Sequence, residues 1–168
     1  MNGAPKSIRI IKDFPKKGIA FYDIATILAN PKEFNKIVNK MTMEVKKMRA
    51  NTIVGIDSRG FIFAAAVAYK LKLKLVMIRK KGKLPGKTFC TSYKLEYGKN
   101  QLEIQKDMLK GNDKVVIIDD IFATSGTIQA SIKLIKKTKA KTLGVNPSRY
   151  RRCHQCYFCW WRSVLSGD

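Results

Sequence analysis

One stretch, Val115 to Thr127, constrains the fold of this chain more than any other. It begins with four consecutive aliphatic residues, VVII, and a short apolar run of this kind is typical of a strand buried on both faces of a parallel sheet. A short loop follows, and residues 128–137 have the pattern of a helix. The stretch therefore predicts a central strand, a loop and a helix, which together are the repeating unit of α/β proteins.

The loop in this stretch carries two adjacent carboxylates, Asp119 and Asp120, at the end of the predicted strand. Open α/β sheets bind ligands at this end of their strands, and carboxylates accept hydrogen bonds from sugar hydroxyls or help to hold a hydrated magnesium ion. Small residues that let a phosphate approach the start of a helix come next: Ala123, Thr124, Ser125, Gly126 and Thr127. The loop fits a ribose 5-phosphate group. The alternative is an Asp pair that caps a turn before an ordinary helix.

The rest of the chain alternates strands and helices. Strands are predicted at residues 52–56, 73–79 and 142–145, and helices at 31–49 and 61–71, the first with Asn30 as N-cap and Pro31 as first residue. Residues 92–97 and 102–105 are expected to form an antiparallel pair around a turn at 98–100. Residues 13–27 are expected to be a loop, because Pro15 and Gly18 interrupt them. This order predicts an α/β fold with a doubly wound, mostly parallel central sheet and flanking helices.

Two further loops of the predicted sheet carry groups suited to phosphate. Asp57, Ser58 and Arg59 follow the strand at 52–56 as a second candidate anion loop, in which Arg59 supplies a guanidinium. The segment RKKGKLPGKTF, from Arg79 to Phe89, is strongly basic, and its glycines predict a flexible lid over a polyanion. The alternative for Arg59 is a surface side chain in an ordinary turn between strand and helix.

The net charge of +22 raises the question of nucleic-acid binding, since clustered Lys and Arg neutralise phosphates. The lysines are instead scattered through nearly every segment, without a basic stripe interleaved with aromatics. This favours surface solvation and attraction of anionic substrates over specific nucleic-acid binding. The sequence also has no apolar run of about 18 or more residues and no basic start followed by an apolar segment. We therefore expect a protein of about one domain, in the cytoplasm and without membrane binding.

Five motifs in chain order resemble the adenine branch of the type I phosphoribosyltransferases: FPKKGIAFYDI, GIDSRGFIF, RKKGKLPG, SYKLEYGKNQLEIQKD and VVIIDDIFATSGT. The likeness runs from about Asp13 to Val145 and implies the type I phosphoribosyltransferase fold with a small N-terminal hood. It implies a reaction of purine salvage, in which N9 of adenine attacks C1 of PRPP and AMP and pyrophosphate form. It also implies magnesium as cofactor and a homodimer.

The resemblance further implies how PRPP would be bound. Asp119 and Asp120 would accept the ribose hydroxyls, and residues 123–127 would bind the 5-phosphate, although Ser125 stands where many relatives have glycine. Six residues would contact the pyrophosphate: Asp57, Ser58, Arg59, Arg79, Lys80 and Lys83. Lys83 would belong to the lid, and the peptide bond between Asp57 and Ser58 is expected to be cis, as it often is in the family.

The same resemblance implies the catalytic and adenine-binding residues. Glu96 and Tyr97 would close over the site and act with Arg59, the carboxylate by shuttling a proton or by stabilising an oxocarbenium-like sugar. Phe21 would stack on adenine and the Ala20 backbone would contact the edge of the base; taken alone, Phe21 is better explained by core packing. Tyr22 stands where relatives often have arginine. No metal ligation by side chains is implied.

The chain departs from the family pattern after about residue 145. Residues 146–168 contain four Arg and no Lys, both Trp, the only His and three of the four Cys. This shift defines residues 1–145 as the phosphoribosyltransferase domain and 146–168 as an atypical, disordered or loosely packed tail, and it suggests a changed reading frame or an alternative splice. Cys153, Cys156 and Cys159 near His154 are a weak zinc pattern, because zinc sites usually draw on two separated pairs.

Two alternatives to an active enzyme remain at this point. One is a truncated relative that binds PRPP or AMP with little turnover, because the altered tail has removed part of the base pocket. The other, less favoured, is a basic nucleic-acid-binding protein, which would hold duplex tightly at high salt.

Overall fold

The computed structural model describes residues 9–94, 99–119 and 125–146. The described residues divide into two compact units, one up to Lys40 and the other from Met41 onward. Helix α2 (Pro31–Lys47) runs through this boundary. The predicted tail at 146–168 lies outside the described residues except for Asn146, so its four candidate metal ligands and its conformation stay predictions.

The first unit contains a small antiparallel hairpin and a short helix. Strands β1 (Arg9–Lys12) and β2 (Ala20–Asp23) pair in a register that sets Arg9 opposite Asp23, and the two side chains form an ion pair. Helix α1 (Ala25–Leu28) follows, and α2 begins at Pro31, where the Asn30 side chain accepts hydrogen bonds from two backbone N–H groups. The predicted N-cap is confirmed. The predicted loop at 13–27 is wrong for residues 20–23 and 25–27, because Pro15 and Gly18 mark only the turn between β1 and β2, and β2 and α1 follow that turn.

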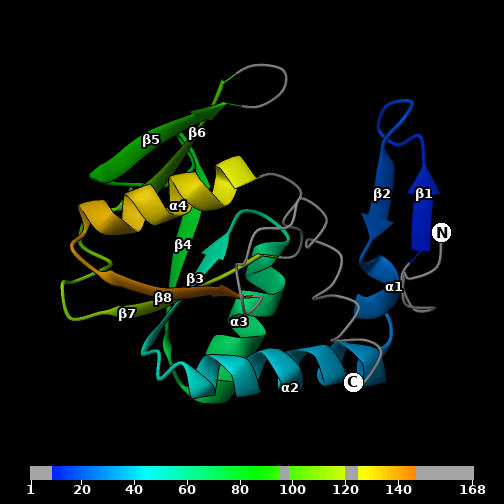
Figure 1. Cartoon of the computed structure of the whole chain (residues 1–168), viewed down its shortest axis with the longest axis horizontal. Coiled ribbons are helices and arrows are strands. Elements are labelled where there is room, and N and C mark those ends of the chain that lie inside the picture. The colour runs from blue at the N-terminus through cyan, green and yellow to red at the C-terminus, as the bar shows by residue number, and fades with distance from the viewer. Residues whose placement is uncertain (1–8, 95–98, 120–124, 147–168) are drawn as a thin grey trace. The chain divides into compact units, whose positions relative to one another are not determined.

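The second unit is a six-stranded sheet with the order β5–β6–β4–β3–β7–β8 (Figure 1). Its strands are β3 (Thr52–Ile56), β4 (Lys74–Lys80), β5 (Thr88–Lys94), β6 (Lys99–Gln105), β7 (Lys114–Ile118) and β8 (Lys141–Asn146). β4, β3, β7 and β8 are mutually parallel, whereas β6 pairs antiparallel with β4 and with β5. The predicted α/β fold with a doubly wound, mostly parallel sheet is confirmed.

The predicted hairpin formed by β5 and β6 is also confirmed, with pairing that extends to Lys94 opposite Lys99. The predicted turn at 98–100 is wrong for Lys99 and Asn100, which belong to β6. Polar residues with turn chemistry are here paired in a strand, because the antiparallel partner satisfies their backbone groups.

Helices cover both faces of the parallel strands. Helix α4 (Ser125–Lys137) lies over one face, where Val54 and Ile56 of β3 join a core with Leu134 and Ile135. Helix α3 (Gly60–Leu71) lies over the other face. It packs so closely there that a Cβ placed on Gly55 of β3 would be only 2.8 Å from the Cβ of Ala64. Every residue of β3 is buried, as the burial of a central parallel strand requires.

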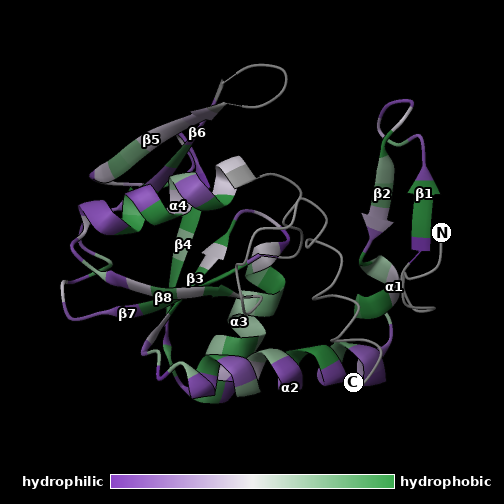
Figure 2. Cartoon of the chain, in the orientation of Figure 1, coloured by the Kyte–Doolittle hydropathy of each residue, from purple (hydrophilic) through white to green (hydrophobic). Residues whose placement is uncertain are grey.

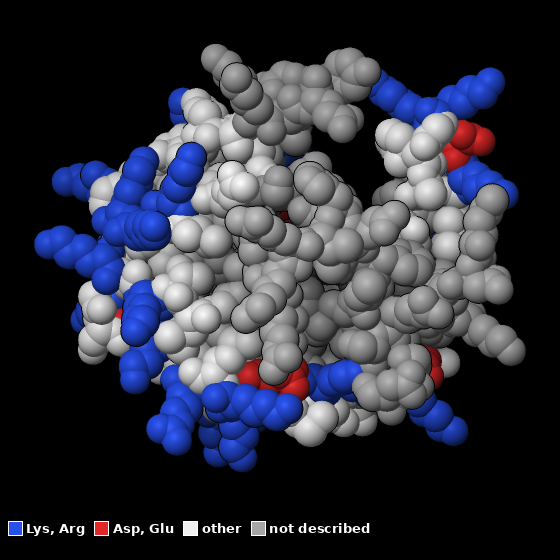
Figure 3. Space-filling model, in the orientation of Figure 1, with Lys and Arg blue, Asp and Glu red and all other residues white. Residues whose placement is uncertain are grey.

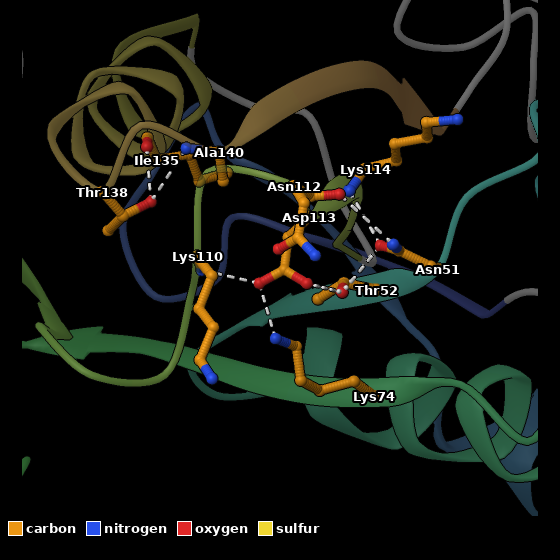
Figure 4. Close-up of polar contacts among 10 residues, drawn as sticks. All are labelled: Asn51, Thr52, Lys74, Lys110, Asn112, Asp113, Lys114, Ile135, Thr138 and Ala140. Atoms are coloured by element: carbon orange, nitrogen blue, oxygen red, sulfur yellow. Dashed lines mark hydrogen bonds and ion pairs between the residues drawn. The ribbon is translucent and has the colours of Figure 1, made fainter.

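The starting edge of the parallel strands is tied together by Asp113 (Figure 4). Its carboxylate accepts hydrogen bonds from Lys74 Nζ at 2.5 Å, from the Lys110 N–H at 2.7 Å and from Thr52 Oγ1 at 3.3 Å. Burial alone would raise the pKa of Asp113, but these hydrogen bonds and the charge of Lys74 outweigh it and lower the pKa below its ordinary value. The ionised carboxylate therefore joins β3, β4 and the turn before β7.

The surface chemistry follows from this layering. α3 is mostly apolar along its length, whereas α4 alternates apolar and polar faces (Figure 2). Lys and Arg gather where α4 ends and β7 and β8 begin (Figure 3), and the exposed lysines there are Lys114, Lys136, Lys137, Lys139 and Lys141. Across the described part of the chain, none of the helices has the length and apolar character that crossing a bilayer requires.

Candidate active site

Three polar residues lie at the carboxyl ends of neighbouring parallel strands, at the same edge of the sheet. Asp57 comes directly after β3 and Asp119 directly after β7, while Arg79 is the next-to-last residue of β4. The registers pair Ile56 with Ile78 and Gly55 with Ile118, so the three strands end at the same level. The convergence predicted from the strand ends is therefore present, at the edge where α/β sheets bind their ligands.

Gly60 brings the first turn of α3 against the end of β7. A Cβ on Gly60 would lie 2.9 Å from Asp119 Oδ1, 3.0 Å from the Ile118 carbonyl oxygen and 3.1 Å from Asp119 Cα. Only glycine leaves room for this approach. The Asp119 carboxylate consequently lies beside the N-terminus of α3.

The loop between β3 and α3 is compact. The Asp57 N–H donates to the Ile78 carbonyl at 2.9 Å, and the carbonyls of Ser58 and Arg59 accept from the first turn of α3. The peptide bond between Asp57 and Ser58 is cis, as the resemblance implied. Ser58 is exposed and Arg59 half-buried, so both reach the surface at this edge.

Arg79 links this loop to the basic segment after β4. Its Nε donates to Asp57 Oδ2 at 2.9 Å, and its Nη1 donates to the Lys83 carbonyl at 3.1 Å. The guanidinium also lies over the ring of Phe61, 5.9 Å from the ring centroid. A charge held from three directions can act as a fixed contact for an anion at low cost in side-chain ordering.

The basic segment itself is tied down by a residue that the sequence reasoning missed. Glu103 on β6 is 4% exposed, and its Oε1 accepts hydrogen bonds from the N–H groups of Lys83 and Leu84. The side chains of Lys80 and Lys83 are exposed on this segment. The only sequence signal for Glu103 is a carboxylate between two apolar residues of a strand, which also describes an ordinary solvent-facing position.

The candidate phosphate loop is partly described. Ser125 is the first residue of α4, and Gly126 and Thr127 follow in its first turn, so these residues stand at a helix N-terminus as expected. Asp120, Ala123 and Thr124 lie outside the described residues, as do Glu96 and Tyr97 between β5 and β6.

The adenine candidates Ala20 and Phe21 lie on β2, in the first unit. The Phe21 ring meets the ring of Phe14 edge to face, with centroids 5.1 Å apart. Phe21 is half-buried. It therefore packs against a neighbour and keeps part of its surface exposed, which leaves its stacking on adenine a prediction.

Comparison with known proteins agrees with this geometry. The phosphoribosyl transferase domain family matches residues 23–146. An adenine phosphoribosyltransferase from Mycoplasma mobile is 52% identical over 141 residues, which cover 84% of this chain and 81% of that relative. The chain belongs to the adenine phosphoribosyltransferase family. Its membership accounts for the order of the five sequence motifs along the chain.

Solved structures of adenine phosphoribosyltransferases share the fold. The enzyme from Thermoanaerobacter pseudethanolicus is 42% identical, with a TM-score of 0.80 over 83% of this chain and 81% of that chain. The Saccharomyces cerevisiae adenine phosphoribosyltransferase is 35% identical, with the same TM-score and coverage, and was solved with adenine and an imino-altritol bisphosphate. The type I phosphoribosyltransferase fold expected from the sequence is confirmed.

Proposed function

We propose that this chain transfers the phosphoribosyl group of PRPP to adenine, giving AMP and pyrophosphate in purine salvage. The observation that carries the proposal is the meeting of Asp119, the Asp57–Arg59 loop and Arg79 at the carboxyl edge of the sheet, in a chain whose relatives are adenine phosphoribosyltransferases. A carboxylate for ribose and guanidinium groups for phosphate are the two chemistries that PRPP requires.

The ribose 5-phosphate end of PRPP is assigned to the loop between β7 and α4. Asp119 and Asp120 accept hydrogen bonds from the ribose hydroxyls, which fixes the orientation of C1. The 5-phosphate lies against the N–H groups at the start of α4, where Ser125, Gly126 and Thr127 place no bulky side chain in its way. Ala123 and Thr124 complete this cradle in the proposal.

The leaving pyrophosphate is assigned to the loop after β3 and to the basic segment. Negative charge grows on the pyrophosphate as the bond to C1 breaks, and Arg59, Arg79, Lys80 and Lys83 would stabilise it. The hydrogen bond of Asp57 to Arg79 keeps the guanidinium at the end of β4, beside the exposed Ser58. The base end is assigned to Phe21 and Ala20 for adenine.

Glu96 and Tyr97 are proposed to close over the reacting centre. A carboxylate near C1 stabilises the oxocarbenium-like sugar or moves the proton released from adenine N9, and an aromatic neighbour excludes water. Arg59 acts with them on the developing charge of the leaving group.

Magnesium is proposed to enter with PRPP. The described residues contain no group of three or more His, Cys, Asp or Glu side chains arranged to hold a metal ion. Mg²⁺ commonly keeps several waters and binds through substrate phosphates with one or two carboxylates, so the Asp119 carboxylate and the substrate fit the ion without a protein cage. When bound, magnesium neutralises charge on the leaving pyrophosphate.

The assembly is proposed to be a homodimer in the cytoplasm. α3 exposes the apolar side chains of Ile62 and Tyr69, and β4 exposes those of Leu75 and Met77. Tyr69 is 89% exposed in the single chain, which makes this surface the best candidate for the subunit interface. Sedimentation velocity that gave a monomer at micromolar concentration would contradict the dimer.

The function is tested by AMP formation. Purified protein with magnesium and PRPP is supplied with adenine, hypoxanthine or guanine, and the nucleotides are separated by chromatography. We expect AMP from adenine and little product from the other two bases. Binding of PRPP without turnover would instead favour the truncated, catalytically weak relative, and an absence of both would refute the proposal.

A further inference from the structure

Glu103 connects the middle of β6 to the basic segment between β4 and β5. Its Oε1 accepts from the Lys83 N–H at 3.0 Å and from the Leu84 N–H at 2.8 Å, and its Oε2 accepts from Thr88 Oγ1 at 3.3 Å. A buried carboxylate is stable only when its lone pairs are satisfied, and three donors from one segment satisfy this one. All three donors lie within residues 83–88, so the carboxylate organises that segment.

The backbone of Lys83 is held at both its N–H and its carbonyl. Its N–H donates to Glu103 while its carbonyl accepts from Arg79 Nη1, and the Nε of the same guanidinium donates to Asp57. Arg79 and Glu103 are also paired across β4 and β6, so their side chains share one face of the sheet. A continuous chain of hydrogen bonds therefore runs from Glu103 through Lys83 and Arg79 to the loop after β3.

The rest of the segment is also bonded to β6 and its continuation. The Lys81 N–H donates to the Gln101 carbonyl, the Gln105 side chain donates to the Pro85 carbonyl, and the Lys106 N–H donates to the Lys87 carbonyl. Bonds at both ends and in the middle favour a fixed platform over the opening lid that its glycines predict. Lys83 and Lys80 then project from a backbone whose position is set before any ligand binds.

We propose that Glu103 is a positioning residue for the leaving group: it holds the 81–88 segment so that Arg79 and Lys83 present their charges to the pyrophosphate of PRPP. The role rests on the proposed function. Glu103 is nearly buried and need not touch the substrate, because its effect passes through the Lys83 peptide and Arg79. Preorganised cations stabilise a growing charge without the cost of arranging them during the reaction.

Three variants test this role. Glu103→Leu removes the acceptor and keeps the buried volume, Glu103→Gln keeps an amide oxygen that can accept both N–H groups, and Gln101→Leu is the matched control. Gln101 lies on the same strand and the same face, but its side chain donates to Ser92 on β5 and not to the basic segment. Glu103→Ala is a second variant without an acceptor, for use if the leucine variant does not fold.

The readouts separate positioning from general stability. In Glu103→Leu we expect the KM for PRPP and the Kd for magnesium pyrophosphate to rise on the order of tenfold, with the KM for adenine within about twofold. Glu103→Gln should restore PRPP binding to within about threefold, and Gln101→Leu should match the wild type. Amide hydrogen exchange of residues 80–88 should accelerate in Glu103→Leu alone.

Each outcome decides a separate point. Unchanged PRPP and pyrophosphate binding in Glu103→Leu, beside normal wild-type activity, would overturn the positioning role and leave the proposed function intact. Equal losses for adenine and PRPP, or a glutamine variant as poor as the leucine variant, would also overturn it. A wild-type protein that neither turns over nor binds PRPP would refute the function, and the positioning role with it.

Discussion

Replacing Gly60 by alanine tests the contact on which the candidate site is built. The new Cβ would meet two atoms that cannot move aside, the Ile118 carbonyl oxygen at 3.0 Å and Asp119 Cα at 3.1 Å. Both belong to the end of β7, which pairs with β3 on one side and β8 on the other. Because β7 is held on both sides, the first turn of α3 must retreat instead.

The magnitude follows from two opposing effects. Forcing a methyl group into a packed contact costs about 1–3 kcal/mol, and two backbone contacts near 3.0 Å indicate the upper part of that range. Alanine in place of glycine at a helical position stabilises the helix by up to about 1 kcal/mol, which offsets part of this cost. A net loss of about 1–2 kcal/mol lowers the Tm of a chain of this length by roughly 2–8 °C.

The same movement should weaken catalysis. The loop of Asp57, Ser58 and Arg59 enters α3 directly, so a retreat of the helix carries the loop away from Asp119. We expect the KM for PRPP to rise by roughly tenfold or more, since displacement of binding groups by about 1 Å costs up to a hundredfold in rate. The KM for adenine should change less.

Gly111→Ala is the matched control. Its new Cβ would have no neighbour closer than 3.8 Å, which is ordinary van der Waals contact. Differential scanning fluorimetry and steady-state kinetics on both variants and the wild type decide the matter. If Gly60→Ala melts at the temperature of Gly111→Ala and keeps the wild-type KM for PRPP, the close approach of α3 to β7 does not organise the site.

Three further predictions concern single carboxylates. Asp119→Ala should lower kcat/KM for PRPP by roughly tenfold to a hundredfold, the loss expected for hydrogen bonds to a charged group, and unchanged kinetics would contradict its contact with ribose. Glu96→Ala should lower kcat by about a hundredfold or more with a smaller change in PRPP Kd, and parallel losses in both would exclude an effect confined to the transition state. Asp113→Asn should lower the free energy of unfolding near pH 7 by about 1–3 kcal/mol. Because the Lys74 ammonium is part-exposed, solvent screens its ion pair with Asp113, and the loss should lie toward the lower end of this range. The pKa of Asp113 is lowered, so its contribution is present above the ordinary carboxyl pKa and is lost as pH falls through the lowered value. Urea unfolding from pH 7 down to about pH 2 should show the difference between wild type and variant shrinking, and a constant difference would refute this linkage.

The central sheet was predictable because its strands are buried on both faces. The short, β-branched runs at 52–56 and 115–118 favour a buried strand by their length and composition, and the strands match them to within one residue. The hairpin of β1 and β2 was not predictable in the same way. Every residue of β1 is exposed, so no alternation of apolar and polar positions marks it as a strand.

The site was predictable as far as it depends on strand ends. A residue that follows a parallel strand must lie at the carboxyl edge, which places Asp57 and Asp119 near each other whatever the intervening sequence. Glu103 could not be found by this logic, because its partners are backbone N–H groups about twenty residues earlier in the chain. Backbone donors leave no signal in side-chain patterns, so nothing in the sequence pointed from Glu103 to the basic segment.

The two edges of the sheet use carboxylates for different purposes. At the starting edge, Asp113 takes its donors from Lys74, Lys110 and Thr52, which are all internal to the unit, so its charge serves the fold alone. At the carboxyl edge, Asp57 shares its partner, because Arg79 is also a candidate contact for pyrophosphate. Substitution at Asp113 should therefore change the free energy of unfolding with little effect on the KM for PRPP. Substitution at Gly60 should change both, and this contrast separates the scaffold from the site in one protein.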